Sequence, residues 1–157
     1  MTPSATASTS SPPTYGTVIE ENRRRVPRAH IVMVGCPTAV REGGCPDVQP
    51  MAASAATYLQ SEIDQLDTGM ARQAAPHGAT FIDVSESTFA HDICAGPQSW
   101  MVGALPVSAD APVPMHPTHE SHRDTADRIV EAHTADGRPA AFERSNCARR
   151  AGNNSHR

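Results

Sequence analysis

The sequence predicts an α/β fold, because a β-branched run, a long amphipathic segment and a second β-branched run follow one another along the chain. Residues 30–34 have the sequence His-Ile-Val-Met-Val, residues 51–72 carry apolar side chains at helical spacing, and residues 80–84 have the sequence Thr-Phe-Ile-Asp-Val. Strand, helix and strand form a βαβ unit, whose strands are parallel and whose crossover is right-handed. Two strands cannot satisfy all the backbone groups of a parallel sheet, so we expect this sheet to be incomplete.

The first two elements are expected to be short. An apolar stripe over residues 15–19 precedes the charged residues 20–25, which predicts a helix ended by Val26-Pro27. The run over residues 30–34 is continuously apolar after its first residue, as in strands that are buried on both faces. A loop rich in Gly and Pro follows over residues 36–50.

The longest predicted element is a helix over residues 51–72. Its apolar side chains recur at helical spacing with charges between them, and Pro76 and Gly78 then end it. These apolar residues are Leu59, Ile63, Leu66 and Met70. Residues 80–84 supply the second strand and complete the βαβ unit.

A final amphipathic helix is predicted over residues 123–133. The residues that share one face of it are Ala126, Ile129, Val130 and His133. Thr118 or Ser121 could serve as its N-cap, and Glu120 and Asp124 are favourable near its start.

The chain is expected to hold one folded portion between two disordered segments. Residues 1–14 are almost all Ser, Thr, Pro and Ala, and residues 136–157 are polar, Arg-rich and aperiodic. Neither segment can offset the entropy of ordering itself, so both are predicted to be disordered. The folded portion is then residues 15–135, with one Trp, two Tyr and three Phe available in the whole chain.

Charge and hydropathy argue against two classes of partner. The net charge is −4, every basic side chain is Arg, and no aromatic residues interleave with the Arg clusters, so no nucleic-acid partner is expected. No apolar run reaches the ~18 residues that span a bilayer, so no integral membrane segment is expected. The N-terminus lacks the basic region and apolar core of a signal peptide, so the chain as written is expected in the cytoplasm. The oligomeric state is not predicted.

The strongest candidate for chemistry is the run over residues 116–122, His-Pro-Thr-His-Glu-Ser-His. Pro117 would hold His116 outside the predicted helix as an exposed imidazole, which suits a general base. An Asp at the end of the strand over residues 80–84 and another in the turn over residues 91–94 lie upstream. Taken alone, a single His before a helix is more often a surface residue.

The same histidines raise the alternative of a metal site. His116, His119 and His122 are spaced by three residues, and positions i and i+3 share a helix face. Pro117 separates His116 from that face, however, and only the turn His91-Asp92-Ile93-Cys94 offers distant further ligands. We therefore expect His119 and His122 to face solvent or to cap the helix, and we expect no metal or other cofactor.

Three motifs, taken in order, resemble one enzyme family. They are "AHIVMVGCP" (29–37), "GATFIDVSESTFAHDICAGPQSW" (78–100) and "HPTHESH" (116–122). Together they resemble the C-terminal half of the SGNH (GDSL-type) esterases and lipases that actinobacteria secrete, over about residues 15–133. The resemblance implies a partial three-layer α/β/α sandwich on a flavodoxin-like parallel sheet. It also implies hydrolysis of carboxylic esters or lipids by Ser-His chemistry, with the catalytic histidine at His116.

The chain departs from the family pattern in several places. The Gly-Asp-Ser block that bears the nucleophile does not occur in these 157 residues, nor do the blocks that supply oxyanion donors. Thr118 stands where the family has Asn, Ser121 where it has Gly, and Val113 where an Asp often precedes the histidine. Asp110 is the nearest carboxylate that could orient His116, and a backbone carbonyl is the alternative. Without nucleophile and donors, the isolated chain is expected to be nearly inactive.

The cysteines are Cys36, Cys45, Cys94 and Cys147, and no C-x-x-C motif occurs. The resemblance implies a disulfide between Cys45 and Cys94, which would contribute about 4 kcal/mol in the chain-entropy account. Two free thiols are the alternative, and Cys36 and Cys147 are expected to stay unpaired. Such a bridge implies an oxidising compartment, as for the secreted parent family and unlike the cytoplasm.

Two classes of function follow. The first is a hydrolase-like protein whose substrate, if it is active, is a small-molecule ester or lipid. The second is a catalytically inactive fragment or interaction module, with a His-rich metal-binding protein as a weaker third reading. Trp100 could line a substrate pocket or could be a packing residue.

Overall fold

The computed structural model describes residues 14–105 and 113–135, so the segments predicted to be disordered lie outside the described residues, except for Thr14. Helix α1 (Thr14–Arg25) leads to strand β1 (Val32–Val34), helix α2 (Ala53–Ala74) and strand β2 (Thr80–Ile82). A 3-10 turn, η1 (Ala75–His77), joins α2 to β2. After β2 come α3 (Ser85–Thr88), the 3-10 turns η2 (Phe89–His91) and η3 (Gly96–Gln98), and α4 (His119–Ala135).

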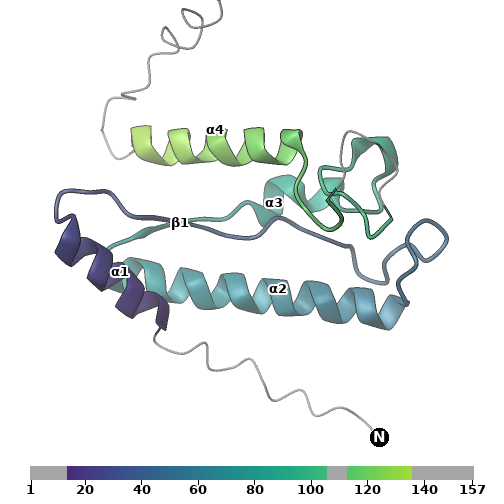
Figure 1. The fold of residues 1–157 in the computed structure, drawn as a ribbon, viewed down its shortest axis with the longest axis horizontal. Coiled ribbons are helices and arrows are strands. Elements are labelled where there is room, and N and C mark those ends of the chain that lie inside the picture. The colour runs from purple at the N-terminus through teal and green to yellow at the C-terminus, as the bar shows by residue number, and fades with distance from the viewer. Residues whose placement is uncertain (1–13, 106–112, 136–157) are drawn as a thin grey trace, which may run out of the picture.

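The predicted βαβ unit is confirmed. Strands β1 and β2 pair in parallel, with Val32 opposite Thr80 and Val34 opposite Ile82. Helix α4 lies on one side of this sheet, and α1 and α2 lie on the other (Figure 1). Within the described residues the sheet has two strands with helices on both of its sides, so the architecture is the partial three-layer α/β/α sandwich that the family resemblance implies.

Both strands are shorter than predicted. Strand β1 begins at Val32 rather than His30, and β2 ends at Ile82 rather than Val84. All three residues of β1 are only half-buried, so the prediction of a strand buried on both faces is wrong. The reason is that β1 has one described strand neighbour and α4 lies against β2, which leaves the side chains of β1 partly uncovered.

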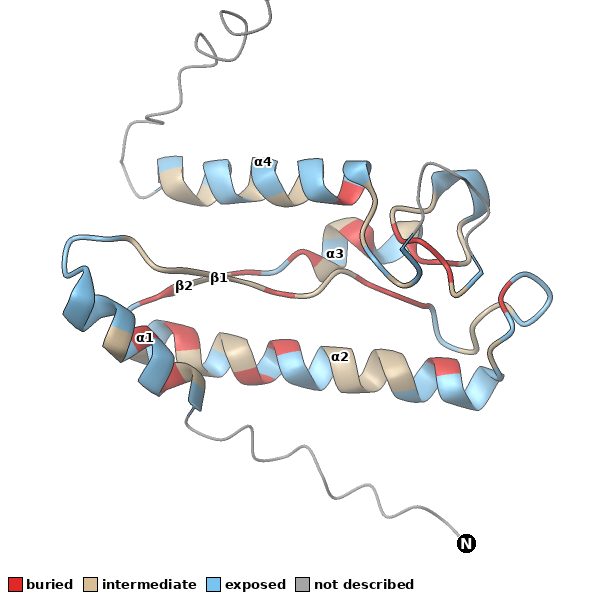
Figure 2. Ribbon diagram, viewed as in Figure 1, coloured by how far each residue is buried: buried red, intermediate tan, exposed pale blue. Residues whose placement is uncertain are grey.

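The long helix ends as the sequence predicts. After Ala74 the chain makes the η1 turn, which contains Pro76, and Gly78 then adopts φ 76°, a left-handed conformation that glycine adopts without strain. Leu59 and Ile63 from α2 pack against one core cluster, at the carboxyl-end side of the sheet. That cluster consists of Ala39, Val40, Ala56, Ile93 and Met101. A second cluster, near the amino ends of the strands, consists of Ile19, Ala74 and Ala79 (Figure 2).

Helix α4 does not bury the apolar face expected of it. Ile129 and Val130 are exposed, and of the predicted face only His133 is half-buried, where its ring stacks on His30 at 6.1 Å. The helix instead turns a polar side inward, since Asp124 accepts a hydrogen bond from Ser87 of α3. Ser121, considered as an N-cap, is fully buried in the first turn, and Thr118 is the residue that precedes the helix.

No helix within residues 14–105 and 113–135 is both long enough and apolar enough to cross a bilayer. The longest, α2, has 22 residues but carries charged side chains along its length.

Candidate active site

The loop that precedes α4 lies on the side of the molecule where both strands end (Figure 1), and by its sequence position it contains His116. The backbone of this loop pairs with the segment over residues 100–103. The N–H of Val102 donates to the carbonyl of His116 at 2.8 Å, and the N–H of Thr118 donates to the carbonyl of Trp100 at 2.8 Å. An antiparallel bridge also joins Met101 and Pro117. Regular backbone pairing therefore fixes the chain on both sides of the imidazole.

The ring of His116 is oriented by a backbone carbonyl. Its Nδ1 lies 2.8 Å from the carbonyl oxygen of Pro114. Because a carbonyl only accepts hydrogen bonds, Nδ1 must carry the proton, and in the neutral ring Nε2 is left as a proton acceptor. Of the two orienting groups considered for His116, the described residues supply the carbonyl, and Asp110 lies outside them.

Two carboxylates that precede His116 in the sequence, those of Asp83 and Asp92, bind other groups. Asp83, after β2, accepts hydrogen bonds from the backbone N–H and the hydroxyl of Ser85. Asp92 is buried and binds Arg41 and the N–H of Cys94. Neither carboxylate therefore orients the imidazole, and the described part of the site is a His–carbonyl pair.

His116 opens onto a cleft of about 710 Å³. That volume lies in the range of about 300–1,000 Å³ that accommodates a small organic ligand. Apolar side chains make up much of its wall, namely those of Val48, Ile93, Pro97, Met101, Val102, Val113 and Pro117. The imidazole thus lines a cleft whose surface is more apolar than polar.

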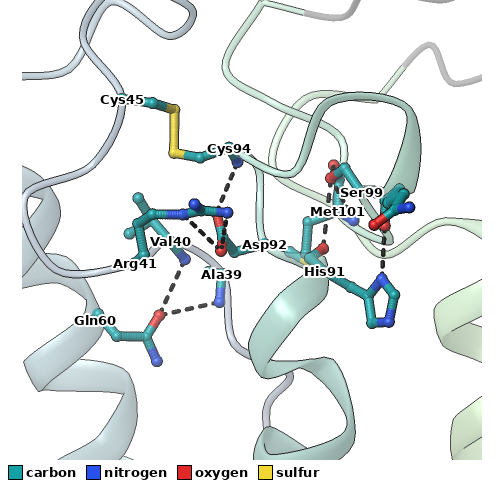
Figure 3. A network of polar contacts seen from close by, with 11 residues as sticks. Ala39, Val40, Arg41, Cys45, Gln60, His91, Asp92, Cys94, Ser99 and Met101 are labelled. Carbon is teal, nitrogen blue, oxygen red and sulfur yellow. Dashed lines mark hydrogen bonds and ion pairs between the residues drawn. A yellow bond between two sulfur atoms is a disulfide. The ribbon is translucent and has the colours of Figure 1, made fainter.

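A disulfide, an ion pair and a set of hydrogen bonds hold the loop after β1 (Figure 3). Cys45 and Cys94 form a disulfide, which confirms the predicted pairing. The buried carboxylate of Asp92 accepts from Arg41 Nε at 3.0 Å and from the N–H of Cys94 at 2.7 Å. Gln60 of α2 accepts from the N–H groups of the residue pair 39–40 through one oxygen. The loop after β1 and the loop after α3 are therefore linked covalently and by charge on either side of Ile93, which lines the cleft.

Trp100 is a packing residue in this arrangement. Its ring stacks on His91 with centroids 3.8 Å apart and ring planes 3° apart. His91 is held in turn by the carbonyl of Gln98, which accepts from its Nδ1 at 2.7 Å. The stack stiffens the segment that pairs with the His116 loop.

The other histidines of the run do not form a metal site. His119 and His122 are both exposed, as the sequence predicts, and His119 Nε2 lies 2.9 Å from a nitrogen of Arg123. Among the described residues, no group of three or more His, Cys, Asp or Glu side chains could hold a metal ion. Glu120, beside them, has its pKa lowered by its own backbone N–H and by the Thr118 hydroxyl.

Cys36 forms a second polar feature where β1 ends. Its backbone N–H donates to both carboxylate oxygens of the buried Asp67, at 2.9 and 3.0 Å. Burial, and then the charge of Asp67, raise the pKa of the Cys36 thiol to about 11. Burial also raises the pKa of Asp67. A thiol with so high a pKa is a poor nucleophile at neutral pH, so Cys36 does not substitute for a catalytic serine.

Sequence reasoning missed three residues of this site. Pro114 orients the imidazole through a main-chain atom, which no side-chain pattern reveals. Met115 has φ 59°, a conformation that a non-glycine residue rarely adopts, and no turn signature marks it. Gln49 is buried in the cleft wall, although it lies in a loop where a polar side chain is expected to be exposed.

No family model matches the chain, whereas individual proteins do. Lipase 2 of Streptomyces coelicolor is 30% identical over 112 residues, which are 69% of this chain and 38% of that protein. Lipase 1 of the same organism is 32% identical over 72 residues, which are 46% of this chain and 26% of that protein.

Two solved structures share the fold. Phospholipase A1 from Streptomyces albidoflavus matches with a TM-score of 0.65 and 22% identity, over 78% of this chain and 51% of that one. An extracellular lipase from Streptomyces rimosus matches with a TM-score of 0.65 and 22% identity, over 78% of this chain and 50% of that one. The chain therefore spans less than half of the curated relatives and about half of each solved chain.

Proposed function

We propose, on the premise that this chain is an SGNH-hydrolase-like relative of actinobacterial lipases, that it supplies the general base and part of the substrate cleft for hydrolysis of a carboxylic ester. The lipid ester hydrolase-like character of its relatives supports the reaction class. The observation that carries the proposal is the bond between His116 Nδ1 and the Pro114 carbonyl, which leaves Nε2 free to take a proton.

The chemistry assigns His116 two steps. Nε2 accepts the proton of an attacking hydroxyl as its oxygen bonds to the ester carbonyl carbon, and the imidazolium then gives that proton to the leaving alcohol. The Pro114 carbonyl, at 2.8 Å from Nδ1, stabilises the imidazolium between these steps. In the second half, water attacks the acyl ester that has formed, Nε2 accepts the proton of the water, and the imidazolium returns it to the departing hydroxyl as the acid is released.

We infer that the attacking hydroxyl comes from outside the described residues. The 157 residues contain no Gly-Asp-Ser block, and two serines of the described segments beside the cleft have structural partners. Ser99 donates to the carbonyl of Met101 at 2.5 Å, and Ser121 is buried in the first turn of α4. His116 supplies only the base, so the reaction also needs hydrogen-bond donors for the developing oxyanion.

A fusion enzyme tests the proposal. The portion of the Streptomyces rimosus lipase that has no counterpart in this chain is joined ahead of Thr14, and cooperative unfolding of the product is checked first. We expect turnover of 4-nitrophenyl butyrate, a loss of at least about a thousandfold in kcat for His116→Ala, and retention within a few-fold for His77→Ala, which lies outside the cleft. A folded fusion without turnover would support an inactive interaction module. Turnover that survives His116→Ala would contradict the role of His116 as the base.

A further inference from the structure

Gln49 is the most deeply buried polar side chain in the wall of the His116 cleft. It is 3% exposed, and it lines the same space as His116. Its backbone is fixed on both sides, because its N–H donates to the carbonyl of Cys45 at 2.8 Å and its carbonyl accepts from the N–H of Met51 at 2.7 Å. The disulfide at Cys45 therefore anchors the turn that carries this side chain.

In the carboxamide of Gln49, the oxygen Oε1 has a hydrogen-bond partner among the described residues and the nitrogen Nε2 has none. Oε1 accepts a hydrogen bond from the backbone N–H of Leu105 at 3.1 Å. Since an N–H can bond only to an acceptor, this contact fixes which end of the amide is oxygen. The two NH₂ hydrogens then point the other way, and among the described residues no acceptor receives them.

The Nε2 end of the amide lies against Gly103, another residue of the cleft wall. A Cβ at Gly103 would come within 2.2 Å of Gln49 Nε2, so only glycine leaves room for the amide there. The carbonyl of Gly103 in turn accepts from the N–H of Met115 at 3.4 Å, next to His116. Gln49, Gly103 and the histidine loop are thus parts of one packed wall.

We propose that the Gln49 NH₂ group is the hydrogen-bond donor that recognises the carbonyl or carboxylate oxygen of an acyl ligand in this cleft. An amide donor on the wall of an open cleft is hydrated when the cleft is empty, and a ligand oxygen would replace the water that the ligand displaces. The apolar wall suits the hydrocarbon part of such a ligand, whereas a uniformly polar ligand would leave that wall exposed to water. The acyl class of the ligand rests on the proposed function, but binding itself requires no nucleophile.

The test therefore uses the whole chain without any fusion partner. Sodium decanoate, below its micellar concentration, and methyl octanoate, which keeps the carbonyl and carries no charge, are titrated by calorimetry and by NMR. Gln49→Glu keeps the length and the oxygen that faces Leu105 but loses the donor. Gln65→Glu, on the exposed side of α2, makes the same charge change away from the cleft.

We expect saturable binding of both ligands, weakened at least about tenfold by Gln49→Glu and unchanged by Gln65→Glu. In the wild-type chain, the side-chain NH₂ resonances of Gln49 should move downfield as ligand is added, a readout that does not depend on the variant folding. Equal affinity in Gln49→Glu, no saturable binding by the wild type, or an unmoved Gln49 resonance would overturn the assignment. None of these outcomes bears on turnover by the fusion, so the two proposals fail separately.

Discussion

Nδ1 of His116 lies 2.8 Å from the carbonyl oxygen of Pro114, two residues earlier in the same loop. In Ser-His-Asp enzymes a carboxylate fixes the tautomer of the histidine and stabilises its charged form. Here a backbone carbonyl occupies that position, and it can do so only if the loop holds its shape. The properties of that loop and of its supports are therefore the features to test.

The left-handed backbone of Met115 is the first such feature. Met115 and Met51 pack against the same core cluster, but only Met115 has a positive φ, 59°. A β-branched side chain is disfavoured in that conformation. We expect Met115→Ile to lower the free energy of unfolding by about 1–2 kcal/mol more than Met51→Ile does, as measured by urea denaturation. Equal losses would mean that the loop is not strained at Met115.

The ion pair between Arg41 and Asp92 is the second. Asp92 is 1% exposed and Arg41 is about half-exposed, so removing the guanidinium leaves a buried carboxylate with one backbone donor. We expect Arg41→Ala to cost about 2 kcal/mol, less than for a fully buried pair because water reaches the guanidinium. Arg24→Ala, which breaks an exposed pair with Glu21, should change the free energy of unfolding much less. If the two variants unfolded alike, Asp92 would not depend on Arg41.

The disulfide between Cys45 and Cys94 is the third. It links residues 49 positions apart, and loop closure of that length stabilises the fold by about 4 kcal/mol in the chain-entropy account. We expect a Cys45→Ser, Cys94→Ser variant to lose most of that free energy in denaturation under oxidising conditions. A Cys36→Ser variant serves as the control for loss of a thiol. An unchanged unfolding midpoint in the double variant would show that the bridge is not a support of the cleft.

The Cys36 thiol provides a pH-dependent prediction. Burial and Asp67 raise its pKa to about 11, so at pH 8 the folded chain should hold on the order of a hundredfold less thiolate at Cys36 than the unfolded chain. Alkylation by iodoacetamide, followed by peptide mass spectrometry, should therefore be slow at pH 8 and should accelerate as the pH approaches 11. Asp67→Asn removes the negative charge and should raise the rate at pH 8. A rate at pH 8 equal to that in urea would contradict the raised pKa.

The order of elements could be predicted from the sequence because their signals are local. The spacing of Leu59 and Ile63 marks α2, and Pro76 and Gly78 mark its end. The length and burial of β1 could not be predicted, because they depend on how many strands flank it. The prediction that α4 buries its apolar stripe was wrong for the same reason. Burial of Ile129 and Val130 depends on which element packs against them, and both side chains are exposed.

The site was predictable to a smaller extent. His116 and the Cys45–Cys94 pair followed from family motifs, and the structure adds the bond and the bridge geometry around them. Pro114 acts through its carbonyl, which every residue possesses, so its role has no sequence signature. The burial of Gln49 has no sequence signature either, because it arises from contact with Gly103, more than fifty positions away.

The tautomer of His116 is the most direct measurement of the central claim. In the chain labelled with ¹⁵N at its histidines, two-bond correlation spectra distinguish a ring protonated at Nδ1 from one protonated at Nε2. We expect the neutral His116 ring to carry its proton on Nδ1, with Nε2 free, while an exposed ring such as His122 shows the mixture of tautomers found in water. A neutral His116 ring protonated at Nε2 would remove the proton-accepting nitrogen from the cleft and contradict the assignment of this residue as the base.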